Sequence, residues 1–321
     1  MTLERVADLA NQIKQNIQTV IVGKSKTIDL MLTALFAGGH VLIEDTPGTG
    51  KTMLAKSLAA SVNASFRRIQ FTPDLLPSDI TGIHMFHPRE NEFKFIPGPA
   101  FTNILLADEI NRATPRTQSA LLECMAEAQI TVDGDTFPLE TPFFVVATEN
   151  PIETAGTFPL PEAELDRFLL RLPMKPPTSH EELLILDRFI EDNPYDTLKP
   201  VCSGSDIIEA SKTCRTVFVH KCVRQYIVDL VQTSRSHSAV RLGASSRSAL
   251  ALLNACQAYA AIQKSPFVTP DHVKLLAVPV LAHRILLNGG NTTSKDTEAL
   301  ITELLGSVSV PTEDWGIPAH K

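Results

Sequence analysis

Residues 40–52, HVLIEDTPGTGKT, join an apolar run to a glycine-rich turn that ends in a Lys-Thr pair. Successive backbone N–H groups in such a turn can surround a phosphate chain. The lysine can reach the β- and γ-phosphates, and the threonine hydroxyl can bind Mg²⁺. The apolar run at 41–43 and the helical pattern after residue 52 supply the strand–turn–helix context that this motif requires. The segment therefore predicts a site for ATP or GTP.

The usual spacing of this motif is G-x-x-x-x-G-K-[ST], and Asp45 stands at the position of its first glycine. We expect the turn and the start of its helix to hold the phosphates through Pro47, Gly48, Thr49, Gly50, Lys51, Thr52 and Met53. Thr52 would also bind Mg²⁺. The alternative is a Pro-Gly turn followed by an ordinary lysine, which the flanking patterns disfavour.

Two further apolar runs end in polar residues that suit hydrolysis. The run 103–107 leads to Asp108, which would hold Mg²⁺, and to Glu109, which would polarise the attacking water. The run 143–148 leads to Asn150, whose amide can donate to a γ-phosphate oxygen and orient the water. The alternative for Asn150 is a turn-forming residue before a proline.

The order of these segments, followed by LPEAELDRF at 160–168, resembles an AAA+ ATPase and, within that superfamily, the MoxR family. The resemblance covers most of the chain and also rests on 20–24, 68–82, 98–134 and 243–253. Asp45 is a tolerated variant in that family, whereas Ser246 stands where the family often has proline. The resemblance implies an α/β fold: a P-loop AAA+ core with a parallel sheet flanked by helices, and a smaller all-α lid domain.

The resemblance also assigns individual roles. Asn150 becomes sensor 1, Arg167 the arginine finger and Arg247 sensor 2, while Val22 and Gly23 would lie against the adenine. A planar guanidinium suits the charge that spreads over the phosphate oxygens during transfer.

Both arginines have alternatives that the residues leave open. Arg167 can form an ion pair with Glu164 or Asp166 of its own subunit. Arg247 can be a capping or solvated residue in the first turn of a helix that begins near Ser245.

Pattern and proline content divide the chain. Strand and helix signals alternate up to about residue 172, prolines follow at 173, 176 and 177, and helical patterns dominate beyond them. We expect an AAA+ αβα core at 1–175 and a helical lid at 179–321, whose first helix carries a capping box from Ser179 to Glu182. The core would contain a helix-2 insert at about 72–99 and a pre-sensor-1 hairpin at about 129–140, with its turn at Asp133 and Gly134.

The insert carries histidines and apolar side chains whose roles differ with exposure. His84 and His87 have H-x-x-H spacing but no third ligand nearby, so we expect surface histidines and not a metal pair. Four apolar residues are expected to pack the insert onto itself, and if exposed they would form a client-contact surface: Met85, Phe86, Phe93 and Phe95.

Composition narrows the class of protein. The net charge of −7 disfavours nucleic-acid binding. The five cysteines form no C-x-x-C pair, which suggests neither zinc nor a disulfide framework and fits a reducing cytoplasm. The N-terminus lacks the apolar core that a signal peptide would have. The sequence also contains no run of about 18 uncharged apolar residues, which a membrane-spanning helix would need.

The resemblance implies a homo-hexamer that hydrolyses ATP with Mg²⁺. It would act in a chaperone-like way to remodel or mature a partner, with a von Willebrand factor A domain protein as the expected partner and metal or cofactor insertion as one outcome. The alternatives are a nucleic-acid motor with the same inserts, a magnesium-chelatase-like subunit, and a nucleotide-gated scaffold that hydrolyses ATP poorly.

Overall fold

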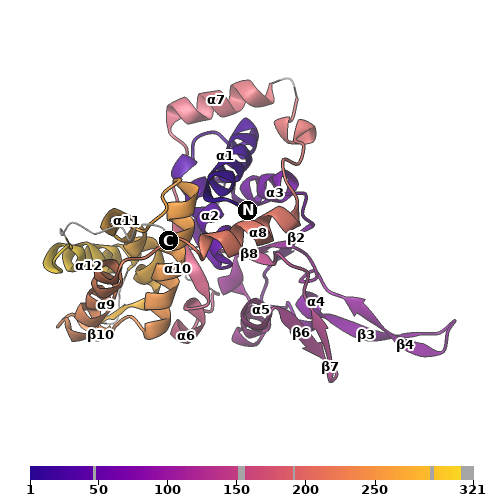
Figure 1. Cartoon of the computed structure of the whole chain (residues 1–321). Helices are drawn as coiled ribbons and strands as arrows, with labels where there is room; N and C mark the ends of the chain where they lie inside the picture. Colours follow the sequence, from indigo (N-terminus) through magenta and orange to yellow (C-terminus); the bar gives the residue numbers. More distant parts are fainter. Residues whose placement is uncertain (46–47, 151–155, 191, 290–292, 312–321) are drawn as a thin grey trace. The chain divides into compact units, whose positions relative to one another are not determined.

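The computed structural model describes residues 1–45, 48–150, 156–190, 192–289 and 293–311 (Figure 1). The chain divides into two compact units, one of residues 8–211 and one of residues 1–7 with 212–321. Within the described ranges, no helix combines the length and apolarity needed to cross a bilayer.

The larger unit is built on a five-stranded parallel sheet, which confirms the predicted fold class. Its order is β2-β5-β8-β1-β9, and the strands are β1 His40–Asp45, β2 Phe66–Gln70, β5 Ile104–Asp108, β8 Phe144–Glu149 and β9 Phe168–Met174. Strands β5 and β8 are buried along nearly their whole length because helices cover a parallel sheet on both faces. Parallel pairing gathers the carboxyl ends of all five strands at one edge.

Helices precede, connect and follow these strands. In chain order they are α1 Leu3–Val20, α2 Ser25–Ala37, α3 Lys51–Ser61, α4 Pro77–Thr81, the 3₁₀ turn η1 Ile110–Arg112, α5 Pro115–Glu127, α6 Glu162–Leu165, α7 Ser179–Phe189, η2 Pro194–Thr197 and α8 Gly204–Cys214. Helix α2 ends at Gly38, whose φ of 74° gives the left-handed cap that glycine favours. The capping box of α7 joins Thr178 to Glu181, one residue earlier than predicted, because Thr178 takes the extended N-cap conformation.

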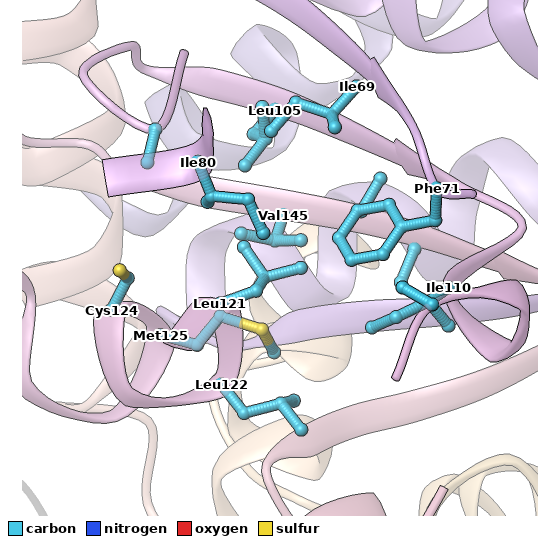
Figure 2. Close-up of a cluster of buried hydrophobic side chains, with 14 of the residues drawn as sticks. Ile69, Phe71, Ile80, Leu105, Ile110, Leu121, Leu122, Cys124, Met125 and Val145 are labelled. Carbon is cyan, nitrogen blue, oxygen red and sulfur yellow. The ribbon is translucent and has the colours of Figure 1, made fainter. Parts of the chain in front are cut away.

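The main core of this unit lies between α5 and the sheet. Leu121 of α5 sits beside Val145 of β8, with Ile80 and Phe71 on either side (Figure 2). All four side chains are fully buried, together with Leu105 of β5. This packing holds β5 and β8 in place below the edge of the sheet that carries their polar ends.

Two hairpins extend beyond α4 and α5 (Figure 1). The insert forms an antiparallel pair, β3 Gly82–His87 with β4 Glu92–Pro97, and the second hairpin pairs β6 Gln129–Val132 with β7 Asp135–Pro138. Asp133 and Gly134 form its turn with φ values of 52° and 94°, as a two-residue hairpin turn with positive φ requires. The two strands lie within the range of about 129–140 that the sequence indicates for a hairpin.

The insert packs onto itself only in part. The Phe95 ring stacks on Phe137 of the second hairpin at 4.2 Å, and Phe86 and Phe93 pair at 5.4 Å. Phe93 is nevertheless 70% exposed, and Met85 and Phe86 are exposed as well. From the sequence, we expect these side chains to form a client-contact surface if they are exposed.

The two histidines of the insert differ. His84 Nδ1 lies 2.9 Å from Asp133 Oδ2, so His84 joins the two hairpins, whereas the half-exposed His87 is a surface residue. Among the described residues, no group of three or more His, Cys, Asp or Glu side chains is placed so that it could hold a metal ion.

The smaller unit is mostly helical. Its helices are α9 Lys221–Ser236, α10 Ser246–Ile262, α11 Pro270–Leu281, η3 Ala282–Arg284 and α12 Ser294–Ser307. A short antiparallel pair, β10 Val240–Leu242 with β11 Leu286–Leu287, was not predicted. Strands of two and three residues are too short to produce a detectable alternation of polar and apolar positions. The tail beyond residue 311 lies outside the described residues.

The compact units do not follow the proline boundary. Helices α7 and most of α8 group with the ATPase core, since the division falls between Ser211 and Lys212. The boundary at 175–179 remains a proposal about where the lid begins.

The buried sheet leads to a stability prediction. Leu105→Ala should lower the free energy of unfolding by about 2–5 kcal/mol, because Leu105 has no exposed surface and its truncation leaves a cavity. Leu186→Ala, on a side chain of α7 that is 65% exposed, should change it by less than about 0.5 kcal/mol. Urea unfolding followed by circular dichroism measures both, and equal losses would show that the core is placed wrongly.

Candidate active site

The glycine-rich turn joins β1 to the start of α3. Gly48 and Gly50 have φ values of 91° and 90°, a backbone conformation that L side chains rarely adopt. Gly50 caps α3, and the helix begins at Lys51. The first N–H groups of a helix have no partner within it, so this turn presents donors to an anion. Pro47 lies outside the described residues.

Asp108, at the end of β5, lies next to the turn. Its carboxylate is 5% exposed, and the Lys51 Nζ is 3.4 Å from Oδ1. The Thr148 hydroxyl at the end of β8 donates to the same oxygen at 2.7 Å. Arg68 of β2 donates to Oδ2 through Nε at 3.1 Å and Nη2 at 2.7 Å. Both carboxylate oxygens therefore have partners.

These partners keep Asp108 ionised. Burial by itself raises the pKa of a carboxyl, but the hydrogen bonds from Thr148 and Arg68 and the positive charges of Lys51 and Arg68 outweigh it. The pKa of Asp108 is lowered as a result. Mg²⁺ prefers oxygen ligands, and carboxylates above all. The buried, ionised carboxylate of Asp108 and the hydroxyl of Thr52 are therefore suitable ligands for this ion.

Glu109 adopts a left-handed conformation with φ of 57°. This conformation costs a residue other than glycine about 1–3 kcal/mol and must be held by its surroundings. The Glu109 N–H donates to the Thr148 hydroxyl at 2.8 Å. Its carboxylate Oε2 accepts from Gln70 Nε2 at 2.7 Å and lies 3.0 Å from Arg112 Nε. The predicted catalytic base is thus restrained by neighbours on β2 and η1.

Asn150 follows β8 and is buried. Its backbone oxygen accepts a hydrogen bond from Asn111 Nδ2 at 3.4 Å, which ties the end of β8 to η1. The structure therefore brings four predicted residues to one edge of the sheet: Lys51, Asp108, Glu109 and Asn150.

Sequence reasoning missed the residues that hold this edge together: Arg68, Gln70, Arg112 and Thr148. They belong to β2, η1 and β8. The order of strands in the sheet, which places β2 beside β5, carries this information and is absent from any local motif.

A carboxyl pair lies at the same edge. Glu44 of β1 and Glu149 of β8 are register partners, and Arg171 Nη1 of β9 is 3.1 Å from Glu44 Oε1. Burial and the neighbouring Glu44 charge raise the pKa of Glu149 to about 6, although Arg171 opposes this rise. Sequence analysis did not single out this pair.

Arg167 follows α6, and Val22 and Gly23 lie between α1 and α2. The Arg167 N–H donates to the Glu164 carbonyl at 3.1 Å at the end of α6, while Glu164 Oε1 accepts from Ser119 Oγ at 2.8 Å. Val22 is buried, and the Glu181 side chain lies against Gly23.

Arg247 belongs to the smaller unit, in the first turn of α10. The Ser245 hydroxyl caps that helix by accepting from the Ser248 N–H, so capping does not require the arginine.

The Glu149 pKa leads to a prediction about pH. A carboxyl whose pKa is higher in the folded chain favours folding when protonated, so this contribution is present below about pH 4.5 and is lost as the pH rises past about 6. Glu149→Gln should be more stable than the parent near pH 8, by on the order of 1–2 kcal/mol, and no more stable below about pH 4.5. Thermal unfolding across this range measures it. The exposed-residue control Glu140→Gln should show no such trend, and a parallel trend would refute the assignment.

Comparisons with known proteins agree with this geometry. Residues 40–170 match the ATPase family associated with various cellular activities (AAA), and residues 232–304 match an AAA lid domain. The chain is 46% identical to the uncharacterized protein YeaC of Bacillus subtilis, over 97% of both chains. It is 37% identical to the chaperone MoxR1 of Mycobacterium tuberculosis, over 92% of this chain and 80% of that protein.

A solved structure and a third relative support the same family. The crystal structure of a putative ATPase from Cytophaga hutchinsonii superposes with a TM-score of 0.89 at 34% identity and 97% coverage of both chains. The protein MoxR of Paracoccus denitrificans is 30% identical over 91% of this chain and 93% of its own length. With the strand order, the phosphate-binding turn and the Asp-Glu strand end in place, the chain belongs to the MoxR family of AAA+ ATPases.

Proposed function

We propose that this ATPase hydrolyses ATP with Mg²⁺ as a homo-hexamer and uses the energy to remodel or mature a partner protein. The main support for the proposal is that Lys51, Asp108 and Glu109 lie together where the parallel strands have their carboxyl ends. This place is beside a turn that presents backbone N–H donors. A lysine for the phosphates, a carboxylate for the ion and a second carboxylate as base are the parts that phosphoryl transfer to water needs.

Each part has a proposed role. The backbone of residues 47–53 holds the phosphates, and Lys51 neutralises them. Thr52 and Asp108 hold Mg²⁺, which supplies charge neutralisation to the phosphate oxygens when bound. Glu109 accepts a proton from water once its carboxylate leaves Gln70. Asn150 orients the water.

The proposed nucleotide site also has an adenine side and two arginines. Val22 and Gly23 have the proposed role of lying against the base, and Arg247 has the proposed role of sensor 2. Arg167 is supplied by the neighbouring subunit.

The remodelling role rests on two observations. One relative carries the name chaperone, and the insert hairpin exposes Phe86 and Phe93 at a site suited to contact another protein. A von Willebrand factor A domain protein is the proposed partner, with metal or cofactor insertion as one outcome. The acidic net charge disfavours a nucleic-acid motor.

We place this protein in the cytoplasm. The five cysteines are free thiols, and burial raises the pKa of Cys124 and Cys214 to about 12, which keeps them protonated and unreactive. This pattern fits a reducing compartment.

The catalytic roles lead to the first prediction about activity. Glu109→Gln should bind ATP with about the affinity of the parent and lose nearly all turnover, because the amide cannot accept the proton. Lys51→Ala should lose ATP binding itself. Fluorescent-nucleotide titration and phosphate release measure the two steps separately, and parental turnover by Glu109→Gln would sink the assignment of the base.

Sharing of the site between subunits leads to a second prediction. Arg167→Ala should bind ATP almost normally and lose turnover by ~10³-fold or more if it acts as arginine fingers do elsewhere. Mixing it with Lys51→Ala should restore part of the activity, because a mixed ring contains interfaces where an intact turn meets an intact arginine. Phosphate release measures the recovery.

The mixing experiment needs proof of mixed assembly, which native mass spectrometry provides. Activity of wild type should also rise with protein concentration as the ring forms. Mixed rings without any recovered hydrolysis would place the role of Arg167 within its own subunit.

A further inference from the structure

Arg68 lies closer to the proposed metal ligand Asp108 than Lys51 does. Its Nη2 and Nε lie 2.7 Å and 3.1 Å from Asp108 Oδ2, whereas the Lys51 Nζ lies 3.4 Å from Oδ1. Two guanidinium N–H groups on one carboxylate oxygen form a charge-assisted contact. Arg68 therefore occupies one of the two carboxylate oxygens through which Asp108 could hold a cation.

The same guanidinium continues toward the proposed base. Arg68 Nη2 also donates to Gln70 Oε1 at 2.7 Å, and Gln70 Nε2 donates to Glu109 Oε2 at 2.7 Å. Strand β2 pairs with β5 so that Gln70 is the register partner of Asp108. A continuous chain of hydrogen bonds therefore joins the metal ligand Asp108 to the base Glu109 through two side chains of a neighbouring strand.

Exposure shows which end of this chain can move. The Arg68 side chain is 46% exposed, whereas that of Asp108 is 5% exposed and is also held by the Thr148 hydroxyl. Water reaches the exposed guanidinium and can solvate it, whereas the buried carboxylate of Asp108 needs a positive charge beside it. Arg68 can thus leave Asp108 when another cation takes its place, while Asp108 stays in place.

We propose that Arg68 competes with Mg²⁺ for Asp108 and that, through Gln70, its departure loosens the hold on Glu109. Arg68 is in this sense a positioning residue that links metal binding to availability of the base. The inference rests on the proposed function, since it takes Asp108 as a Mg²⁺ ligand. Beyond that function, the inference assigns Arg68 the role of keeping Glu109 bonded to Gln70 until Mg²⁺ is bound.

The test measures Mg²⁺ affinity and needs no turnover. The full-length protein is saturated with ADP in chelator-treated buffer and titrated with Mg²⁺ by calorimetry. Arg68→Gln should bind Mg²⁺ tighter than the parent, by roughly two- to fivefold, the range that exposed ion pairs give. Arg68→Lys, which keeps the charge, should stay close to the parent.

The chain offers a matched control one residue away. Arg67 lies on the same strand, is exposed, and contacts neither Asp108 nor Gln70 in the described structure. Arg67→Gln makes the same change of charge and should leave Mg²⁺ affinity unchanged. An equal gain in both variants would attribute the effect to net charge and overturn the proposal.

Three further outcomes are decisive. Unchanged or weaker Mg²⁺ binding by Arg68→Gln, while the parent binds ADP and Mg²⁺ normally, overturns the role of Arg68 and leaves the proposed function intact. A parent whose Mg²⁺ affinity is unaffected by Asp108→Asn overturns the metal assignment and the inference with it. Gln70→Ala should raise the Mg²⁺ affinity less than Arg68→Gln does. If Gln70→Ala leaves the Mg²⁺ affinity unchanged, the proposed link from Arg68 to Glu109 through Gln70 is wrong.

Discussion

The carboxylate of Asp108 keeps its charge in a place where 5% of its surface reaches water. An isolated charge at such a position costs several kcal/mol unless hydrogen bonds and opposite charges surround it. Thr148, Arg68 and Lys51 meet that need, and they come from three different strands or loops. Satisfying this one carboxylate therefore fixes the phosphate-binding turn, β2 and β8 relative to β5.

The conformation of Glu109 follows from the same arrangement. Its left-handed backbone is unfavourable by itself, and the hydrogen bond from its N–H to Thr148 helps to hold it. Below the site, buried apolar side chains such as Leu105 and Leu121 keep the strands from shifting. A rigid sheet thus supports a catalytic edge in which one exposed arginine is the group most easily moved.

The sequence predicts the parts that depend on neighbours along the chain. Gly48, Gly50 and the polar ends of β5 and β8 were recognisable because strand, turn and helix signals are local. The roles of Arg68 and Gln70 were not, because only the order of strands brings β2 beside β5. The boundary between the compact units after Ser211 was not predicted either. Prolines mark a change of chain direction, but they do not show which helices pack against the core.

A pair of crystal structures with ADP, one grown with Mg²⁺ and one with chelator, tests whether Arg68 and Mg²⁺ exclude each other at Asp108. We expect that Arg68 bonds to Asp108 Oδ2 with chelator, as it does here, and lies beyond about 4 Å, the limit of an ion pair, when Mg²⁺ is bound. Glu109 should then have lost its hydrogen bond from Gln70. An Arg68–Asp108 contact that is the same in both crystals, with Mg²⁺ present in one, would contradict it.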